Sequence, residues 1–526
     1  MRSIKGLPAL ALALIASLLM GGAALANVEL PAVIGSDMVL QRDMWVPIWG
    51  WADAHEDIVV RVEGGDGPIN IEKTRAAADG TWQVKIRPRP AGGPYTITIE
   101  GDNTVTLEDV LFGEVWVCSG QSNMRWPVQA SNNAEAEIAN ADYPDIRLFQ
   151  VELATADQPK EDTKGEWKPC NPETIPGFTA VGYFFGRELH KELGVPVGLI
   201  QSAWGGTPAE AWTSERGLSD SEYYDEWYKP IIDRWDEIVA NHPRAIRNYQ
   251  KFVIPRWERA VREAELKGES PPGRPQPPTS PNHPHRPSSL YNGMISPIIP
   301  YGIRGAIWYQ GESNASRAYQ YRHLFSDMIR DWRNKWGQGD FPFYFVQLAN
   351  FMQVDEEPTD AAWPELREAQ DMALELPNTG VALAIDIGEA DDIHPRNKQE
   401  VGRRLALNAL SQIHGQNVVH QGPRFYRMAV EDDVAKLYFW DGGADLMVKG
   451  DELAGFAIAG EDRDFVWAEA ELVDGHVEVW SPEVPEPVAV RYAWSSNPVA
   501  NLYNEAGLPA SPFRTDDWPG VTIDAR

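Results

Sequence analysis

The 526-residue sequence is poor in the residues that build metal centres and disulfide frameworks. Cys118 and Cys170 are its two cysteines, and its ten histidines are scattered. It contains neither Cys-x-x-Cys nor His-Glu-x-x-His, so no metal site is predicted. The nearest approach to a histidine cluster, His283 and His285, lies in a proline-rich segment and is expected to be solvated. The cysteines are compatible either with one disulfide or with two buried thiols.

Positive charge is also scarce, since 47 Lys and Arg face 77 Asp and Glu and the formal charge is −30. A chain this acidic repels phosphate backbones and anionic lipid headgroups, which argues against nucleic-acid partners and against membrane binding. Apolar residues make up 43% of the chain and charged residues 24%, as in ordinary soluble globular proteins.

Long apolar runs are absent after the first residues. Leu7 to Met20 is almost wholly apolar, follows the bases Arg2 and Lys5, and precedes Ala24-Leu25-Ala26. This pattern predicts a cleavable signal peptide over residues 1–26 and a periplasmic or secreted protein. No later stretch reaches the 18 apolar residues typical of a membrane span, so the mature chain is expected to be soluble.

Three regions follow, distinguished by their periodicity. Residues 27–110 alternate in short β-type runs separated by glycine-rich turns, which predicts a β-sandwich. Residues 111–414 alternate buried strands with helical segments, which predicts a parallel sheet covered by helices on both faces. Residues 415–526 return to β-type runs and predict a C-terminal β-rich region. The expected elements are strands at 46–51, 58–62, 81–86, 95–99, 114–118, 195–202, 302–309, 343–348, 380–387, 434–440, 465–472, 476–480 and 488–492, and helices at 179–193, 319–336 and 398–413.

An insertion interrupts the α/β region at 220–290. Its first part is a charged helical stretch rich in Trp and Tyr, and its second part, Pro271 to Pro287, holds eight prolines and cannot be regular structure. Both a substrate-shaping arm and a packing appendage are compatible with this composition. The 21 Trp of the chain likewise suit either sugar binding or an aromatic core.

The strongest local motif is Ser119-Gly-Gln-Ser-Asn-Met124, directly after the strand expected at 114–118. A serine at a strand-to-helix turn projects its hydroxyl at the carboxyl edge of a parallel sheet, where active sites of such sheets lie. Gly120 permits a tight bend, and the freed N–H groups can face a developing oxyanion. Ser122 is therefore a candidate nucleophile, although the motif alone also fits a plain turn.

The second motif, Asp391-Asp-Ile-His-Pro395, lies between a strand and a helix at the same edge. Pro395 suits the first helical turn, so the preceding loop holds the acids and the histidine. The three-residue spacing favours Asp391 as the group that orients His394, leaving Nε2 of the imidazole free to accept a serine proton. Asp392 is the rival for this role.

Together these blocks resemble the sialate O-acetylesterase family of SGNH-type serine hydrolases. The similar segments are Val39–Arg42, Gly113–Met124, Ser202–Thr207, Trp308–Ala315, Asp391–Lys398, Arg491–Trp494 and Leu508–Thr515. The resemblance covers most of the mature chain. It implies an SGNH-hydrolase-like (flavodoxin-like) three-layer α/β domain that uses no cofactor.

Carried over to this sequence, the resemblance makes Ser122 the nucleophile, His394 the general base and Asp391 its orienting acid. It also implies an oxyanion hole built from the N–H groups of Ser122 and of Gly205 or Gly206. Gln310 is the favoured third donor and Asn314 the alternative, while Glu312 is expected to organise the site rather than act as an acid.

The resemblance implies an O-acetylated carbohydrate substrate but leaves the sugar open. The family is named for acetylated sialate, whereas similar bacterial chains deacetylate plant polysaccharides such as xylan and xyloglucan. Arg125 is the candidate partner for a sialate carboxylate, but the acidic chain slightly disfavours an anionic substrate. A non-catalytic carbohydrate-binding protein and a serine peptidase are the alternatives from other classes.

Overall fold

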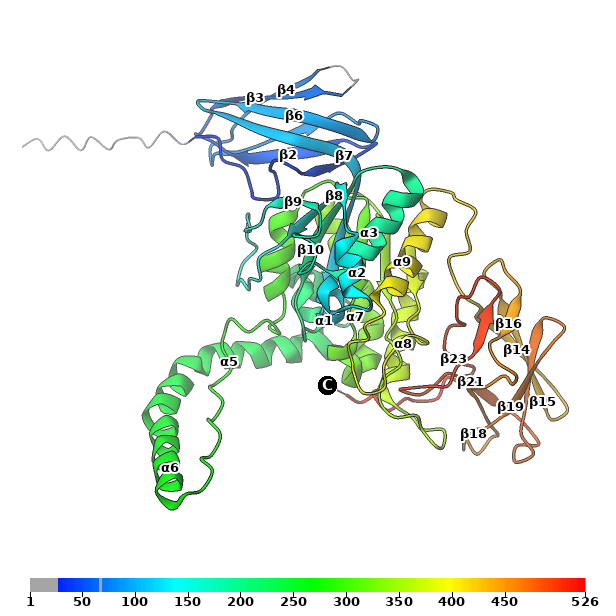
Figure 1. Cartoon of the computed structure of the whole chain (residues 1–526). Helices are drawn as coiled ribbons and strands as arrows, with labels where there is room; N and C mark the ends of the chain where they lie inside the picture. The colour runs from blue at the N-terminus through cyan, green and yellow to red at the C-terminus, as the bar shows by residue number, and fades with distance from the viewer. Residues whose placement is uncertain (1–26, 66–68, 526) are drawn as a thin grey trace, which may run out of the picture.

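The computed structural model of the chain describes residues 27–65 and 69–525, so the predicted signal peptide at 1–26 lies outside the described residues. Figure 1 shows a β-rich unit at the top, a central α/β region, a second β-rich region beside it and a long helical arm that projects away from the body. Within the described residues, no helix has the length and apolar character needed to cross a bilayer.

The N-terminal unit consists of two sheets that enclose one core. One sheet pairs β3 with β4 and β6, and β6 with β7, while the other pairs β2 with β5 in antiparallel fashion. Inward residues of the strands are buried and outward residues exposed, as the alternating sequence predicts. The strands are β1 (Val39–Gln41), β2 (Val46–Trp51), β3 (Asp57–Gly64), β4 (Asn70–Arg75), β5 (Thr81–Ile86), β6 (Gly92–Glu100) and β7 (Thr104–Gly120).

Strand β7 links this unit to the central region. Its first part pairs with β6, and its last part, from Glu114 on, lies between β10 and β11 of the central sheet. Residues 110–120 are buried without alternation, as expected for a strand covered on both faces. One continuous strand thus runs through the boundary expected between residues 110 and 111, and the division of the chain into domains stays a prediction.

The central sheet has the order β13-β12-β11-β7-β10-β8-β9, and all neighbours are parallel except β8 and β9. Counting β7, β10, β11, β12 and β13 as the first to fifth strands gives the spatial order 2-1-3-4-5 of flavodoxin-like sheets. β8 and β9 extend the edge beside β10. The added strands are β8 (Tyr143–Gln150), β9 (Trp167–Cys170), β10 (Val197–Ala203), β11 (Gly305–Tyr309), β12 (Phe343–Val346) and β13 (Thr379–Ala382).

Helices cover both faces of this sheet. Trp116 of β7 packs edge-on against Phe185 of α3, whereas Trp308 of β11 packs against Trp332 of α7. Trp308 is level with Ser119, three residues beyond Trp116, so the two indoles point to opposite faces. The helices of the region are α1 (Ser122–Arg125), α2 (Ala134–Ala139), α3 (Ala180–Leu193), α4 (Glu215–Ser219), α7 (Ala318–Trp336), α8 (Ala362–Asp371) and α9 (Lys398–Gln412).

Local sequence fixes the ends of these helices. The Thr179 hydroxyl accepts a hydrogen bond from the Gly182 N–H at the start of α3, and Gly194 ends that helix in the left-handed conformation. Asn397 caps α9 in the same way by accepting from the Glu400 N–H. These caps place the first residue of α9 just after the loop that holds His394.

The insertion forms the arm seen in Figure 1. It consists of α5 (Lys229–Asn248) and α6 (Ile254–Lys267), joined by a π-helical turn, and the proline-rich segment returns beside them without regular structure. Side chains of the helices hold this segment: the Tyr249 hydroxyl donates to the Pro275 carbonyl at 2.7 Å, and the Trp257 indole donates to the Pro272 carbonyl at 2.9 Å.

The C-terminal region has its own apolar core and packs against α8 through buried polar contacts. Arg367 of α8 is fully buried, and its guanidinium donates to the carbonyls of Ser495 and Ser496. The strands are β14 (Arg424–Glu431), β15 (Val434–Trp440), β16 (Leu446–Val448), β17 (Phe456–Ala459), β18 (Val466–Trp467), β19 (Glu469–Val473), β20 (His476–Trp480), β21 (Ala489–Tyr492), β22 (Leu502–Asn504) and β23 (Phe513–Arg514).

Cys118 and Cys170 are free, buried thiols in different surroundings. Cys118, in β7, faces Gly182 of α3, whereas the Cys170 sulfur lies 3.9 Å from the Ala141 carbonyl. Burial raises the pKa of both thiols, that of Cys170 to about 12. The structure therefore corresponds to the buried-thiol alternative.

Candidate active site

Gly120 sets the turn that exposes Ser122. It ends β7 with φ +135°, a value that favours glycine, and a Cβ at this position would lie 2.2 Å from the Tyr309 carbonyl oxygen. The chain then enters the one-turn helix α1, whose first residue is Ser122. The half-buried serine thus lies just beyond the carboxyl end of the central strand.

The register of the sheet brings three loops together at this edge. Gly120 of β7 is level with Ala203 of β10 on one side and with Tyr309 of β11 on the other. The residues after these strands are therefore neighbours, although they are far apart in sequence. Consistently, a Cβ added to Gly205 would lie 3.2 Å from the Cβ of Ser122.

His394 lies in the loop between β13 and α9 and faces Ser122. Its Nε2 lies 2.8 Å from the Ser122 Oγ, which is hydrogen-bonding distance. The indole of Trp126 stacks on the imidazole at 5.1 Å with an interplanar angle of 13°, and the Trp126 N–H is itself held by the Ala130 carbonyl at 3.0 Å. The ring is thereby oriented with one nitrogen at the serine.

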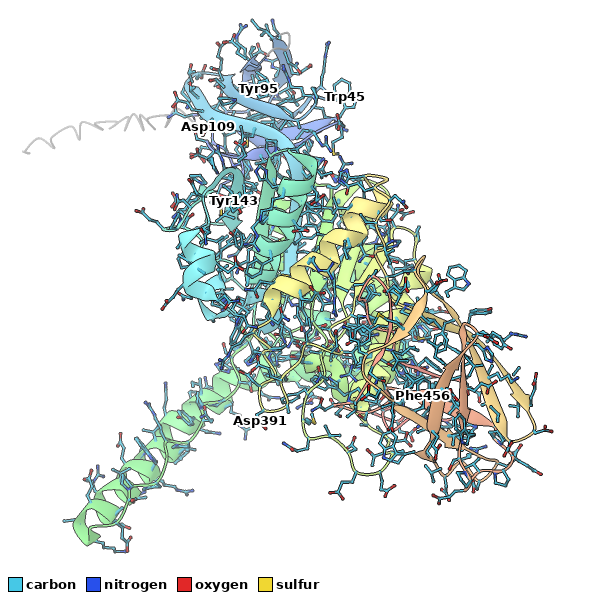
Figure 2. All side chains as sticks on the ribbon, turned by 45° about the vertical axis from the view of Figure 1, so that its right-hand side comes forward. Trp45, Tyr95, Asp109, Tyr143, Asp391 and Phe456 are labelled. Carbon is cyan, nitrogen blue, oxygen red and sulfur yellow. The ribbon has the colours of Figure 1, made fainter. Side chains whose placement is uncertain are left out.

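The carboxylate beside the other ring nitrogen belongs to Asp392, which corrects the expectation for Asp391. Asp392 Oδ1 accepts the backbone N–H of His394 at 2.9 Å and lies 3.5 Å from Nδ1. A carboxylate that accepts the N–H two residues on forms an Asx turn, and this turn brings Asp392 to the imidazole. Asp391 is exposed at the lower surface of the central region (Figure 2), and its carboxylate accepts only a 3.4 Å bond from Gln353 among the described contacts.

The environment of His394 lowers the pKa of its imidazole below the ordinary value of 6.5. Burial is the largest cause, because it disfavours the charged form, and the nearby Lys398 cation acts in the same direction. The Asp392 carboxylate opposes both by stabilising the imidazolium. The lowered pKa favours the neutral imidazole, the form that can accept the serine proton, at pH 7 and above.

Backbone N–H groups are available beside Ser122. Within the described residues, the N–H groups of Ser122 and Gly205 donate to no protein acceptor. Gly205 contacts Ser122, whereas Gly206, with φ +72°, has open space where a side chain would be. Gly205 is thus the nearer of the two glycines to the serine, and its loop and the start of α1 can face one oxyanion.

Gln310 does not provide the third donor expected from the sequence, and the Asn314 amide is partly engaged elsewhere. Both are fully buried, and the Gln310 amide donates to the Thr207 carbonyl at 3.2 Å and to Asn314 Oδ1 at 2.7 Å. The Asn314 amide donates to Glu210 at 3.0 Å. These bonds brace the loop after β10. They engage both N–H groups of Gln310, which contradicts its expected role, but only one of the two N–H groups of Asn314, so the Asn314 alternative stays a prediction.

A buried polar chain next to Ser122 was not predicted as a unit. Lys398, the first residue of α9, donates to Asn123 Oδ1 at 2.6 Å, and the Asn123 amide donates to Glu312 Oε1 at 2.5 Å and to the Ile393 carbonyl at 3.0 Å. Burial lowers the pKa of Lys398 to about 7 and raises that of Glu312. This chain joins the loops of Ser122 and His394 and agrees with the organising role expected for Glu312.

Sequence reasoning also missed Trp126 and Lys398. Trp126 lies just after the end of α1, four residues beyond Ser122, and Lys398 is the first residue of α9, four residues beyond His394. Their closeness in sequence to the two candidate catalytic residues was the available signal. Arg125, the candidate contact for an anionic sugar, is half-buried at the end of α1 and forms no ion pair with any described residue.

A cation has one candidate site within the described residues, the acidic group Asp53, Glu56 and Asp102 in the N-terminal unit. Glu56 there accepts the backbone N–H groups of Asp53 at 2.9 Å and of Asp102 at 2.5 Å, which explains the cluster as a brace between loops. It belongs to a different part of the molecule from Ser122. The groups around Ser122 instead comprise a hydroxyl, a neutral imidazole and free N–H donors, which are the components of acyl transfer through a serine.

Comparison with known proteins identifies acetylesterases as relatives of this chain. A family model described as carbohydrate esterase, sialic acid-specific acetylesterase, matches residues 113–251 and 281–411. The sialate O-acetylesterase of Pongo abelii is 30% identical over 538 residues, covering 93% of each chain, and that of Mus musculus is 31% identical over 528 residues, covering 91% of this chain and 93% of the relative. The crystal structure of a carbohydrate acetylesterase from Xanthomonas citri superposes with a TM-score of 0.78 at 37% identity, covering 94% of this chain and all of the other.

Fold, site and relatives together define the class of the protein, a carboxylic ester hydrolase. More narrowly, the chain belongs to the family of sialic acid-specific acetylesterases among the carbohydrate esterases.

Proposed function

We propose that this protein is a carbohydrate O-acetylesterase that removes acetyl groups through a covalent acetyl-enzyme on Ser122. The observation that carries the proposal is the 2.8 Å contact between the Ser122 hydroxyl and Nε2 of His394. Relatives named sialate O-acetylesterase, and a similar structure named carbohydrate acetylesterase, support acetylated sugars as substrates.

In this mechanism His394 accepts the Ser122 proton as the oxygen attacks the acetyl carbonyl. The N–H groups of Ser122 and Gly205 stabilise the resulting oxyanion, and Asp392 stabilises the imidazolium that forms. His394 then protonates the departing sugar oxygen. Water, deprotonated by the same imidazole, finally releases acetate and restores the serine.

We further propose that the central region is an SGNH-type hydrolase domain. The 2-1-3-4-5 strand order and a serine directly after the first strand of that order support this assignment. The basic, apolar and small-residue pattern of residues 1–26 supports export to the periplasm or the medium, which also remains a proposal.

Two sugar classes remain candidates. Arg125, one helical turn after Ser122 and without a charged partner in the described chain, favours a carboxylated sugar such as sialate. The formal charge of −30 favours a neutral acetylated polysaccharide such as xylan or xyloglucan, because an acidic protein repels anions.

The test is acetate release from O-acetylated sialosides, xylan and xyloglucan, alongside 4-nitrophenyl acetate and casein, in excess chelator. We expect hydrolysis of 4-nitrophenyl acetate and of at least one acetylated sugar. Cleavage of casein alone would support a peptidase, and binding of the sugars without release of acetate would support a non-catalytic carbohydrate-binding protein.

A further inference from the structure

A cleft of about 730 Å³ lies between the base of the arm and the loops next to Ser122. Its volume is within the range of ligand-binding clefts and far exceeds what an acetyl group occupies. The body contributes Gly206 and Ser313, and the arm contributes Arg234, Trp235 and, from its returning segment, His283.

The body wall of the cleft adjoins the candidate catalytic site. Gly206 directly follows Gly205, which contacts Ser122, and the Ser313 N–H donates to the side chain of Gln121 at 3.3 Å. A molecule whose acetyl group lies at Ser122 therefore has the cleft beside it. The remaining charge on this wall is neutralised, because the buried Glu210 pairs with Arg317 at 2.5 Å.

The arm wall presents an apolar stripe to the cleft. Ile231, Trp235 and Ile238 recur at helical spacing along α5, line the cleft and are only half-buried. The imidazole of His283 stacks on Trp235 at 5.7 Å, so the proline-rich loop holds the indole in place. His283 is thus half-buried, contrary to the expectation that it is solvated, whereas His285 is exposed as expected.

The arm is also anchored at its base, so that the two walls keep their spacing. Trp227, just before α5, stacks on Tyr223 at 4.6 Å and packs against His323 of α7. On the returning side, the Ser288 N–H donates to the Glu210 carbonyl at 2.9 Å. The cleft is therefore bounded by contacts that tie both ends of the insertion to the body.

We propose that this cleft binds the sugars that flank the acetylated unit of an oligosaccharide or polysaccharide substrate. The proposal rests on the proposed carbohydrate esterase function and extends it from a single sugar to a chain. The indole of Trp235 offers a flat apolar surface to the C–H face of a sugar ring. The exposed guanidinium of Arg234, which forms no ion pair within the described residues, supplies hydrogen-bond donors for hydroxyl groups.

The kinetic test compares the same acetylated unit with and without flanking sugars: acetylated xylose with acetylated xylohexaose, and O-acetylated sialic acid with an O-acetylated sialyl-oligosaccharide. For the pair that the enzyme cleaves, we expect the longer substrate to have a KM lower by about tenfold, and Trp235→Ala to abolish this difference. Hydrolysis of 4-nitrophenyl acetate, which has no flanking sugar, is expected to stay within about twofold of the wild type. Trp440→Ala, which removes an indole that is 67% exposed on β15, is the matched control. It should leave the KM of both the longer and the shorter substrate unchanged.

Equal KM values for the two members of the pair in the wild type would overturn the proposal. An equal loss of kcat/KM on the longer and the shorter substrate in Trp235→Ala would also overturn it, since that result means that the indole only supports the fold near Ser122. Calorimetric titration of Ser122→Ala with xylohexaose and sialyllactose separates the two proposals, because it needs no hydrolysis. If xylohexaose or sialyllactose binds, and adding Trp235→Ala weakens that binding about tenfold, the result supports sugar binding in the cleft even if no acetate is released. If neither oligosaccharide binds, the cleft proposal is refuted.

Discussion

Replacing Asp392 with Asn tests the arrangement in which the structure departs from the sequence expectation. The substitution removes the negative charge but keeps an oxygen that can accept the His394 backbone N–H, so the Asx turn at 2.9 Å is retained. What disappears is the attraction between the carboxylate and the imidazolium formed during catalysis. Asp391→Asn is the matched control, since it makes the same chemical change one residue away.

The magnitude follows from the distance and the exposure of the pair. Two unit charges about 4 Å apart interact with about 1 kcal/mol in water and about 4 kcal/mol at the effective dielectric constant near a protein surface. Asp392 Oδ1 and His394 Nδ1 are 3.5 Å apart, and their side chains are 36% and 29% exposed, which favours the lower half of that range. We therefore expect Asp392→Asn to lower kcat by roughly five- to seventyfold, and Asp391→Asn to change it by less than about twofold.

The assay is kcat and kcat/KM for 4-nitrophenyl acetate across pH, with melting temperatures measured in parallel. Because the carboxylate raises the pKa of His394, its removal should also move the acid limb of the profile to lower pH. A larger loss in Asp391→Asn than in Asp392→Asn would refute the assignment. So would an unchanged kcat and an unmoved acid limb in Asp392→Asn.

Three further predictions concern the surroundings of Ser122. Gly205→Ala should lower kcat by about 10²-fold with little change in melting temperature, because its Cβ would press on the Ser122 Cβ at 3.2 Å. Gly177→Ala, with open space around it, is the control and should change neither kcat nor the melting temperature. The acid limb of the wild-type kcat/KM profile should have an apparent pKa below 6.5. Lys398→Met should move this limb to higher pH, because it removes a cation that lowers the His394 pKa. A shift of the limb to lower pH would contradict this coupling. Gly120→Ala should lower the melting temperature by several degrees or prevent folding, because its Cβ would overlap the Tyr309 carbonyl oxygen at 2.2 Å. A soluble variant with the melting temperature of the wild type would contradict this tight turn.

The sequence predicted most of the strands and helices because their periodicity is strong and their ends carry recognisable caps. The strands at 46–51, 81–86, 434–440 and 476–480 have the predicted bounds. The motif around Ser122 and the loop of His394 were assigned to one sheet edge because both follow buried strands. The register of β7, β10 and β11 accounts for the meeting of their loops.

The wrong predictions for the site concern cases in which several side chains have suitable chemistry and only the folded structure decides which of them contacts the catalytic group. The three-residue spacing favoured Asp391 over Asp392, because spacing takes no account of the Asx turn that brings Asp392 to the imidazole. Similarly, Gln310 has the right chemistry for an oxyanion donor, but the nearby Thr207 carbonyl and Asn314 side chain consume its N–H groups. Lys398 was missed because a lysine is ordinarily solvated, and its burial depends on how α9 packs against the Ser122 loop.

The most direct test of the account is the turnover of Ser122→Ala on 4-nitrophenyl acetate at pH 8. Ser122 is half-buried at the start of a one-turn helix, so the loss of its hydroxyl should leave the melting temperature nearly unchanged. If this hydroxyl is the nucleophile, turnover should fall by at least about 10³-fold. A folded variant that retains a tenth or more of the wild-type turnover would contradict the central claim.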